Sequence, residues 1–342
     1  MQAMSESLRA IDEWRDVTPE RFRAEIVPAY QPAVLRGIAD SWPAVAAGRG
    51  STRDACTYLA RFDRGATVEA FVGPPEIDGR FFYADDMRGF NFERRRGPFG
   101  EVLRLIADLA DRADAPAVYV GAAPVPDCLP GLAEENDMPL LADTGAVPRI
   151  WFGNASQVGT HFDQSDNIAC VVAGRRRFTL FPPEQAANLY VGPLDHNMAG
   201  QPTSMVSLRE PDLDRFPRFA AALEAASSAE LGPGDALYIP ALWWHNIEAL
   251  AALNILVNYW WDDAPPGAGA PLEAMVHGIL GIAELPPARR AAWRALFDLY
   301  VFREGGDPAA HLAPEHRGIL APPTPQLRAR IRQFLLRGLS RG

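Results

Sequence analysis

The 342-residue chain has few cysteines, no surplus of positive charge and no long apolar run. Its three cysteines are scattered and odd in number, which fits reduced cytoplasmic thiols better than a disulfide framework or a metal finger. The formal net charge of −10 argues against general affinity for nucleic acid or for anionic membranes. No apolar segment is long enough to span a bilayer, and residues 1–16 contain no signal-peptide core. We therefore expect a cytoplasmic protein whose partners include neither nucleic acid nor membrane.

The rest of the composition, 48% hydrophobic and 22% charged, is that of an ordinary globular protein with a large core. From Ile150 onward the apolar segments are short and are separated by glycine and proline turns, which is typical of a sandwich or barrel. We expect a mainly β fold in three parts. These are N-terminal α/β elements over residues 1–116, a β core over residues 117–265 and a helical region over residues 266–342.

A histidine and an aspartate stand one residue apart in the chain, as His161 and Asp163. Alternate residues of a strand point to the same side, so an extended backbone would aim both side chains at one place. With a second imidazole they could form a 2-His-1-carboxylate metal site, which leaves coordination positions open. His245, which follows a Gly-Pro-Gly-Asp turn and two tryptophans, is the best candidate for that imidazole. The His-x-Asp pair alone is weak support, because many such pairs only form hydrogen bonds at a surface.

An arginine occurs on an apolar strand face. Within residues 175–181, Arg176 shares a face with Phe178 and Leu180. If that face is the interior, Arg176 is a buried cation and needs a carboxylate partner. The partner could belong to the protein, as a structural ion pair, or to a ligand, and residue alternation does not decide between the two.

Two more polar side chains stand inside apolar, strand-like segments. Tyr119 lies in residues 117–120, where its hydroxyl would bond either to backbone in a barrel wall or to a ligand. Asn258 shares a face with Leu256 and Trp260, so it also points inward. Both are candidate ligand contacts.

Four spaced motifs resemble the JmjC-type cupins, in particular the cupin-like branch that contains the asparaginyl hydroxylase of hypoxia-inducible factor. They are Thr160–Asn167, Gly174–Pro183, Gly232–Pro240 and Trp243–His245. The likeness extends from about Ala117 to Trp261. It implies a double-stranded β-helix, or jelly roll, and an oxygenase that depends on Fe(II) and 2-oxoglutarate. Such an enzyme would use 2-oxoglutarate and dioxygen to hydroxylate an unidentified prime substrate, either a protein side chain or a small molecule.

The resemblance also implies roles for individual residues. Carried over by position, the iron ligands are His161, Asp163 and His245. The basic residue that pairs with the distal carboxylate of 2-oxoglutarate corresponds by position to Arg176. The asparaginyl hydroxylase has a lysine at this position. An arginine can bind a carboxylate through two parallel hydrogen bonds, so this role is preserved. The remaining co-substrate contacts that the resemblance implies are Tyr119, Asn167 and Asn258.

One position departs from the family pattern. The asparaginyl hydroxylase has a threonine that binds the co-substrate three residues before the first histidine, and this chain has Val158 there. Thr160 could supply the hydroxyl instead, and we include it among the candidate co-substrate contacts. On a regular strand, however, Thr160 would face away from His161 and Asp163.

Two other functions also fit a cupin. One is an enzyme that uses Zn or Mn for isomerisation or hydrolysis, and the other is a non-catalytic protein that binds a metal or a ligand. Arg176 and Tyr119, placed for a dicarboxylate, argue against the first. A complete triad argues against the second.

The predicted C-terminal helices carry apolar stripes. One stripe lies within residues 289–302 and includes Leu296 and Leu299, and another lies within residues 326–339. The stripes would either pack on the barrel or join two copies of the chain. The related hydroxylase dimerises through helices in the corresponding place, so we expect a homodimer.

Overall fold

The computed structural model describes residues 8–110, 112, 114–198, 200–265 and 267–340. The first seven residues of the segment considered for a signal peptide lie outside this part of the chain. The chain divides into two compact units, a β unit (Met1–Asp262) and a helical unit (Asp263–Gly342). Within the described residues, no helix combines the length and the apolar character that a bilayer crossing needs.

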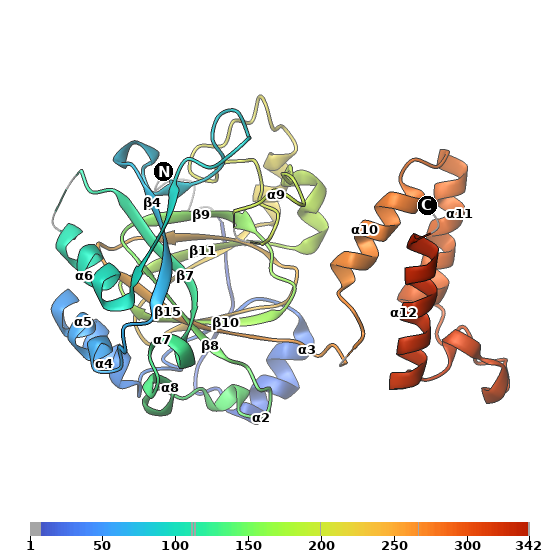
Figure 1. Cartoon of the computed structure of the whole chain (residues 1–342), viewed down its shortest axis with the longest axis horizontal. Coiled ribbons are helices and arrows are strands. Elements are labelled where there is room, and N and C mark those ends of the chain that lie inside the picture. Colours follow the sequence, from blue (N-terminus) through green and yellow to red (C-terminus); the bar gives the residue numbers. More distant parts are fainter. Residues whose placement is uncertain (1–7, 111, 113, 199, 266, 341–342) are drawn as a thin grey trace. The chain divides into compact units, whose positions relative to one another are not determined.

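Two mixed sheets form the β unit (Figure 1). In spatial order, the nine-stranded sheet consists of β2 (Glu13–Trp14), β3 (Ala33–Leu35), β13 (Ala236–Ile239), β10 (Asp166–Ala173), β15 (Asn254–Trp261), β8 (Pro148–Gly153), β7 (Ala117–Pro124), β4 (Thr67–Gly73) and β6 (Glu93–Pro98). The six-stranded sheet consists of β1 (Arg9–Ala10), β12 (Ser227–Leu231), β11 (Arg176–Phe181), β14 (Trp244–Ala249), β9 (Ser156–His161) and β5 (Arg80–Phe81). From β8 to β15 the chain alternates between the sheets, except that β11 and β12 are neighbours in one sheet.

Strand β10 shows how the sequence produces this layering. Ile168 and Cys170 pack into a core shared with the surrounding helices, whereas Ala169 and Val171 pack into a core shared with β11 of the other sheet. Because both faces of β10 are buried, its residues from Ile168 to Ala173 are all apolar and do not alternate with polar residues.

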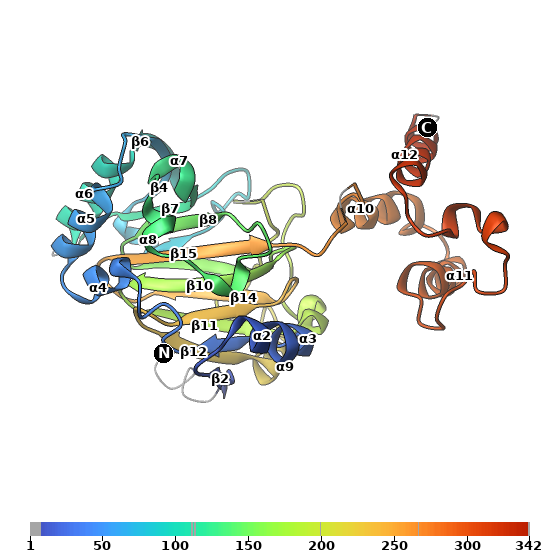
Figure 2. The same ribbon diagram turned by 90° about the horizontal axis from the view of Figure 1, so that it is seen from below.

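Three helices pack against the outer side of the nine-stranded sheet (Figure 2). They are α4 (Pro43–Arg49), α5 (Thr52–Ala60) and α6 (Phe99–Leu109). In α6 the buried residues Phe99, Val102 and Ile106 recur at helical spacing, so one face turns toward the sheet. Gly48 lets α4 approach β10 closely, because a Cβ there would lie 2.0 Å from the carbonyl oxygen of Val172. The shorter helices of this unit are α2 (Pro19–Arg21), α3 (Val27–Ala29), α7 (Val125–Cys128), α8 (Leu132–Glu135) and α9 (Phe219–Ala225).

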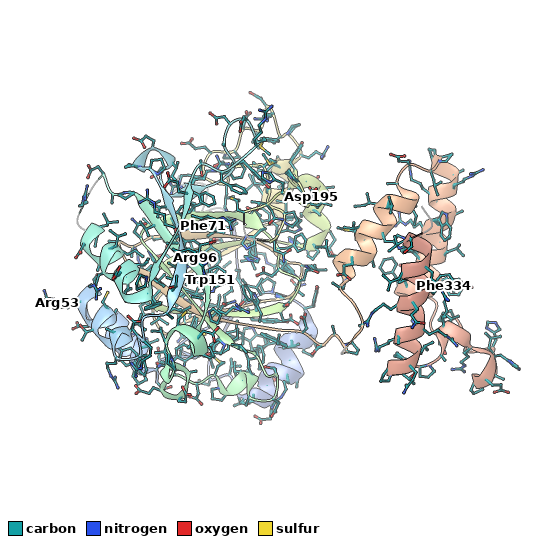
Figure 3. All side chains as sticks on the ribbon, in the orientation of Figure 1. Arg53, Phe71, Arg96, Trp151, Asp195 and Phe334 are labelled. Atoms are coloured by element: carbon teal, nitrogen blue, oxygen red, sulfur yellow. The ribbon has the colours of Figure 1, made fainter. Side chains whose placement is uncertain are left out.

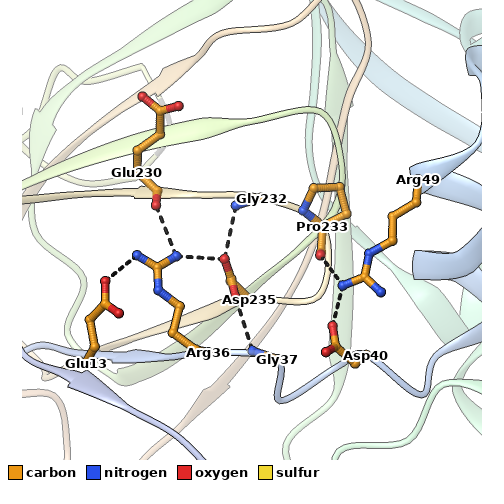
Figure 4. A network of polar contacts seen from close by, with 9 residues as sticks. All are labelled: Glu13, Arg36, Gly37, Asp40, Arg49, Glu230, Gly232, Pro233 and Asp235. Carbon is orange, nitrogen blue, oxygen red and sulfur yellow. Dashed lines mark hydrogen bonds and ion pairs between the residues drawn. The ribbon is translucent and has the colours of Figure 1, made fainter.

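A polar network holds the Gly-Pro-Gly-Asp turn that precedes β13 (Figure 4). The Asp235 carboxylate accepts hydrogen bonds from the backbone N–H groups of Gly37 (3.1 Å) and Gly232 (3.3 Å). It also pairs with Arg36 at 2.7 Å, and Arg36 pairs with Glu13 at 2.6 Å. The network joins the N-terminal strands β2 and β3 to the turn, so it fixes the start of the segment that leads through β13 to β14.

The helical unit contains α10 (Pro271–Ile282), α11 (Pro287–Phe297), a π-helical turn over Asp298–Phe302 and α12 (Pro325–Leu339). Among its described residues, Ala309 is the one apolar side chain that is fully buried. Large exposed apolar side chains include those of Leu280, Trp293, Phe302 and Phe334, the last of which is labelled in Figure 3.

The expected mainly β fold describes the sheets of the β unit but not the whole chain. Helix accounts for 35% of the described residues and strand for 26%. The helix content exceeds the strand content for two reasons: the C-terminal unit is helical, and helices cover the nine-stranded sheet.

Candidate metal centre

Two neighbouring strands of the six-stranded sheet bring the predicted histidines together. His161 ends β9 and His245 is near the start of β14, and the two are direct partners across the antiparallel pair. Their ring centroids are 4.3 Å apart. Oδ2 of Asp163 lies 3.7 Å from Nε2 of His245. One ligand atom from each of the three residues lies within 4.8 Å of the others, so the triad can hold one metal ion.

The placement of Asp163 does not come from strand alternation as predicted, because β9 ends at His161. The backbone carbonyl of Asp163 instead accepts a hydrogen bond from the N–H of Leu242 at 2.8 Å, in the turn before β14. Its carboxylate Oδ2 accepts a hydrogen bond from the indole N–H of Trp260 at 3.1 Å. Sequence reasoning gave Trp260 no role. The available signal was that Trp260 shares an inward strand face with Asn258.

Backbone carbonyls orient both imidazoles. Nδ1 of His161 lies 2.8 Å from the carbonyl oxygen of Gly159, and Nδ1 of His245 lies 3.0 Å from that of Trp243. A proton on each Nδ1 satisfies these bonds and leaves both Nε2 lone pairs for a metal. Burial, reinforced by the nearby His161, lowers the pKa of His245 to about 4. His245 is therefore neutral at physiological pH, as a metal ligand must be.

Arg176 begins β11 and faces the same cavity as the triad, on the side that strand alternation predicts. It is only 3% exposed. Among the described residues no carboxylate lies within 4.0 Å of it, and its Nε has no hydrogen-bond partner. Burial lowers the pKa of its guanidinium to about 10, and the neighbouring Tyr119 acts in the opposite direction. The structural ion pair is thus absent from the described part of the chain, and the cation is available to a ligand.

Tyr119 reaches this region from the other sheet. It lies in β7 and lines the cavity beside Phe81 and Trp151, with each ring centroid 6.0 Å from that of the tyrosine. Burial raises the pKa of its hydroxyl, although the positive charge of Arg176 lowers it. The hydroxyl therefore stays protonated and can donate a hydrogen bond.

Asn167 and Asn258 belong to a hydrogen-bond chain on the nine-stranded sheet. The indole N–H of Trp151 donates to Oδ1 of Asn258 at 2.6 Å, and the side-chain amide of Asn258 donates to Oδ1 of Asn167 at 3.0 Å. All three side chains line the cavity. The packing between neighbouring strands thus orders the two amides before any ligand binds.

Thr160 lies elsewhere. It does not line the cavity, whereas Val158 does. The Thr160 side chain is buried on the other side of β9, where its hydroxyl is 3.4 Å from the amide nitrogen of Asn246. The register between β9 and β14 shifts by one residue here, since His161 pairs with His245 and Val158 with Ile247, so Val158 and His161 both face the cavity while Thr160 does not. Thr160 is therefore no substitute for the missing threonine at Val158.

The cavity that these side chains share has a volume of about 960 Å³. This is much more than a five-carbon dicarboxylate occupies and lies in the range of pockets that hold drug-sized ligands. Its walls include the aromatic side chains of Phe71, Phe81, Tyr119, Trp151 and Trp260. Phe71 of β4 and Trp151 of β8 are labelled in Figure 3. A ligand in the cavity would therefore meet aromatic side chains close to the candidate metal ligands.

Comparison with known proteins assigns this arrangement to a family. The family described as "Cupin-like domain" matches residues 19–266, which is most of the chain. The chain belongs to this cupin-like family. The match confirms the resemblance that the four sequence motifs carry.

Several characterised proteins are similar to this cupin-like chain. Lysine-specific demethylase 8 of Xenopus tropicalis is 26% identical over 258 residues, which cover 71% of this chain and 51% of that protein. The tRNA wybutosine-synthesizing protein 5 of Danio rerio is 29% identical over 273 residues, or 74% of this chain and 75% of that protein. The bifunctional peptidase and (3S)-lysyl hydroxylase JMJD7 of Homo sapiens is 28% identical over 273 residues, or 72% and 81%. The cupin-like chain thus spans about half the length of the demethylase.

Proposed function

We propose that this cupin-like protein is an Fe(II)- and 2-oxoglutarate-dependent dioxygenase that hydroxylates a prime substrate. Arg176 carries the proposal, because it is a buried cation in the same cavity as a His-Asp-His triad. A triad alone would fit many metalloproteins. A buried cation without a carboxylate partner among the described residues fits a metal-bound ligand that has a second, free carboxylate. 2-Oxoglutarate is such a ligand.

The residues present suit these groups. His161, Asp163 and His245 would hold the iron, which when bound supplies open coordination positions and the oxidising chemistry. Arg176 would pair with the distal carboxylate through its charged N–H groups, and the Tyr119 hydroxyl would donate a further hydrogen bond to the same carboxylate. Asn167 and Asn258 offer amide groups on the nine-stranded sheet, which also carries Tyr119. The aromatic side chains around them keep bulk water from the reacting atoms.

The competing functions explain less. A Zn or Mn cupin that isomerises or hydrolyses its substrate has no use for a buried guanidinium. A non-catalytic cupin that binds a metal or a ligand does not need the complete triad of His161, Asp163 and His245. The names of the relatives include a lysine demethylase and a lysyl hydroxylase, so a protein side chain is one candidate substrate for this chain. The cavity volume also admits a small molecule.

The proposal extends to the organisation of the chain. We take strands β8 to β15 as a double-stranded β-helix within a core of residues 117–265, flanked by residues 1–116 and 266–342, in a cytoplasmic enzyme. We also take it to be a homodimer, because the described residues of the helical unit expose many large apolar side chains and bury almost none. A second copy would cover them.

The test of the function is 2-oxoglutarate binding under nitrogen, measured by calorimetry with Mn(II) in place of iron. The wild type should bind 2-oxoglutarate when Mn(II) is present. Arg176→Ala should bind it roughly ten- to more than a hundredfold more weakly, because a charge-assisted hydrogen bond is lost, and should still bind Mn(II). Arg177→Ala, on the opposite face of β11, is the matched control. Absence of binding by the wild type, or equal binding by Arg176→Ala, would refute the proposal. Succinate formation with Fe(II), ascorbate and oxygen then measures turnover.

A further inference from the structure

Arg149 lines the metal cavity without a charged partner. It is the second residue of β8 and is half-buried. One of its N–H groups donates to the carbonyl oxygen of Ala122 at 3.2 Å. Among the described residues no carboxylate lies within 4.0 Å of its guanidinium nitrogens. Since a guanidinium has five N–H donors, most of them are left for water or for a ligand.

The other cations that line the cavity have partners, either in the protein or in the proposed function. Arg94 pairs with Glu69 at 3.2 Å. In the proposed function, Arg176 pairs with the distal carboxylate of 2-oxoglutarate. Asp262 also lines the cavity, but it is exposed to solvent and forms no ion pair with Arg149 within 4.0 Å. Arg149 is therefore the unmatched cation among the described lining residues, and a carboxylate is the group that its planar fork fits.

Trp260 connects Arg149 with the metal ligands. The guanidinium carbon of Arg149 lies 5.6 Å from the centroid of the Trp260 ring, as in a cation–π contact. The N–H of the same indole donates to Oδ2 of Asp163 at 3.1 Å. Trp151 packs edge-on against Trp260 with centroids 5.6 Å apart. Arg149 and the metal site are thus separated by one aromatic wall, along which a flat or apolar ligand could lie.

We propose that the prime substrate is a small carboxylic acid whose carboxylate is bound by Arg149 and whose apolar body lies on Trp260 and Trp151. The inference rests on the proposed function, because it assigns the co-substrate carboxylate to Arg176 and so leaves Arg149 for the substrate. Because one indole, that of Trp260, lies between Arg149 and the metal ligands, the carbon to be oxidised should be a few bonds away from the carboxylate that Arg149 binds. The cavity is large enough to hold such an acid beside 2-oxoglutarate.

The test uses phenylacetate as the probe and its uncharged analogue phenylacetamide as the comparison. The protein is first loaded with Mn(II) and saturated with 2-oxoglutarate under nitrogen, and each probe is then titrated by calorimetry. Phenylacetate should bind saturably at millimolar concentration, and phenylacetamide should bind at least about tenfold more weakly. Arg149→Gln should lose phenylacetate affinity by a similar factor. Arg94→Gln, which changes a cavity arginine that already has a partner, should keep it.

A purely structural role for Arg149 would give a different result. Its bond to Ala122, a residue with a left-handed backbone (φ 52°), would then matter for stability, and Arg149→Gln would unfold more easily while binding phenylacetate normally. If Arg149→Gln fails to fold, Arg149→Lys keeps the charge and introduces the only lysine of the chain. That variant should retain phenylacetate binding more weakly than the wild type, because the paired hydrogen bonds are lost.

Three results would overturn the proposal. They are no saturable phenylacetate binding by the loaded wild type, equal binding of the amide, and unchanged affinity in the folded Arg149 variants. The loading step separates this failure from that of the proposed function. A wild type that does not bind 2-oxoglutarate refutes the proposed function, whereas one that binds 2-oxoglutarate but not phenylacetate refutes only the role of Arg149.

Discussion

Replacing Arg176 with methionine should stabilise the protein when no co-substrate is present. Burial lowers the pKa of this guanidinium from the ordinary value of an arginine to about 10, so the fold disfavours its charged form. A fall of this size corresponds to about 3 kcal/mol of lost stability. The cost is fully present below pH 10, where the arginine is charged in both the folded and the unfolded state, and it disappears as the pH rises toward the ordinary pKa of an arginine. At neutral pH the wild type therefore bears the whole cost.

Methionine keeps most of the apolar stem and removes the charge. Buried charges that are replaced by apolar residues of similar volume often leave a protein about 1–4 kcal/mol more stable. We expect Arg176→Met to gain about 1–3 kcal/mol in the free energy of unfolding, measured in urea at pH 7 without metal or 2-oxoglutarate. Adding Mn(II) and 2-oxoglutarate should remove most or all of this advantage. A ligand at a hundred times its dissociation constant adds about 2.7 kcal/mol to the wild type, and the variant should gain only the metal's share.

The matched control is Arg177→Met on the opposite face of β11. Arg177 is paired with Glu230 at 3.4 Å and with Glu248 at 3.5 Å, near the surface. Its loss should cost at most about 1 kcal/mol, with no change in the response to 2-oxoglutarate. If Arg176→Met is less stable than the wild type without ligand, the guanidinium has a partner and the reasoning fails. An equal response of both variants to 2-oxoglutarate would refute the role of Arg176 in binding.

Three other predictions concern the metal and the assembly. Asp163→Ala should weaken metal binding by more than tenfold, since even the loss of a residue that only hydrogen-bonds to a metal ligand costs about 10–100-fold in affinity. If elemental analysis finds unchanged iron in this variant and in His161→Ala, the triad is not the metal site. Trp260→Phe removes one N–H donor to Asp163 and should weaken Mn(II) binding by about tenfold, whereas Trp151→Phe should leave the Mn(II) affinity unchanged. If electron paramagnetic resonance gives the two variants equal Mn(II) affinities, Trp260 contributes only packing. Light scattering of the full chain at micromolar concentration should give the mass of a dimer, and a monomer would contradict the proposed assembly.

The parts of the site that sequence reasoning placed correctly are those that depend on local strand geometry. Arg176 turns inward with Phe178 and Leu180 because alternate residues of β11 face one way. The same rule put Asn258 on the cavity wall. Alternation needs only a few residues of extended backbone, so it can be applied before the fold is known.

The parts that sequence reasoning could not place depend on contacts between distant segments. Asp163 lies past the end of β9, where its position is set by bonds to Leu242 and Trp260, far along the chain. The ion pair between Arg36 and Asp235 likewise joins residues that are far apart in the chain, and their charges alone do not predict that they pair. A backbone that has left a strand has no fixed period, so its direction follows only from the tertiary hydrogen bonds that hold it.

The hydrogen-bond register of the six-stranded sheet determines how far the cation lies from the metal ligands. His245 of β14 is the direct partner of Leu180 in β11, and Arg176 lies four residues before Leu180 on the same face. Four residues of strand span about 13 Å, a gap that an arginine side chain and a five-carbon dicarboxylate would bridge together. A slip of β11 by one residue would turn Arg176 outward and bring Arg177 into the cavity. The register between β11 and β14 therefore sets the length of the diacid that can reach both the metal and Arg176. It matters for this selection as much as the side chains that would contact the diacid.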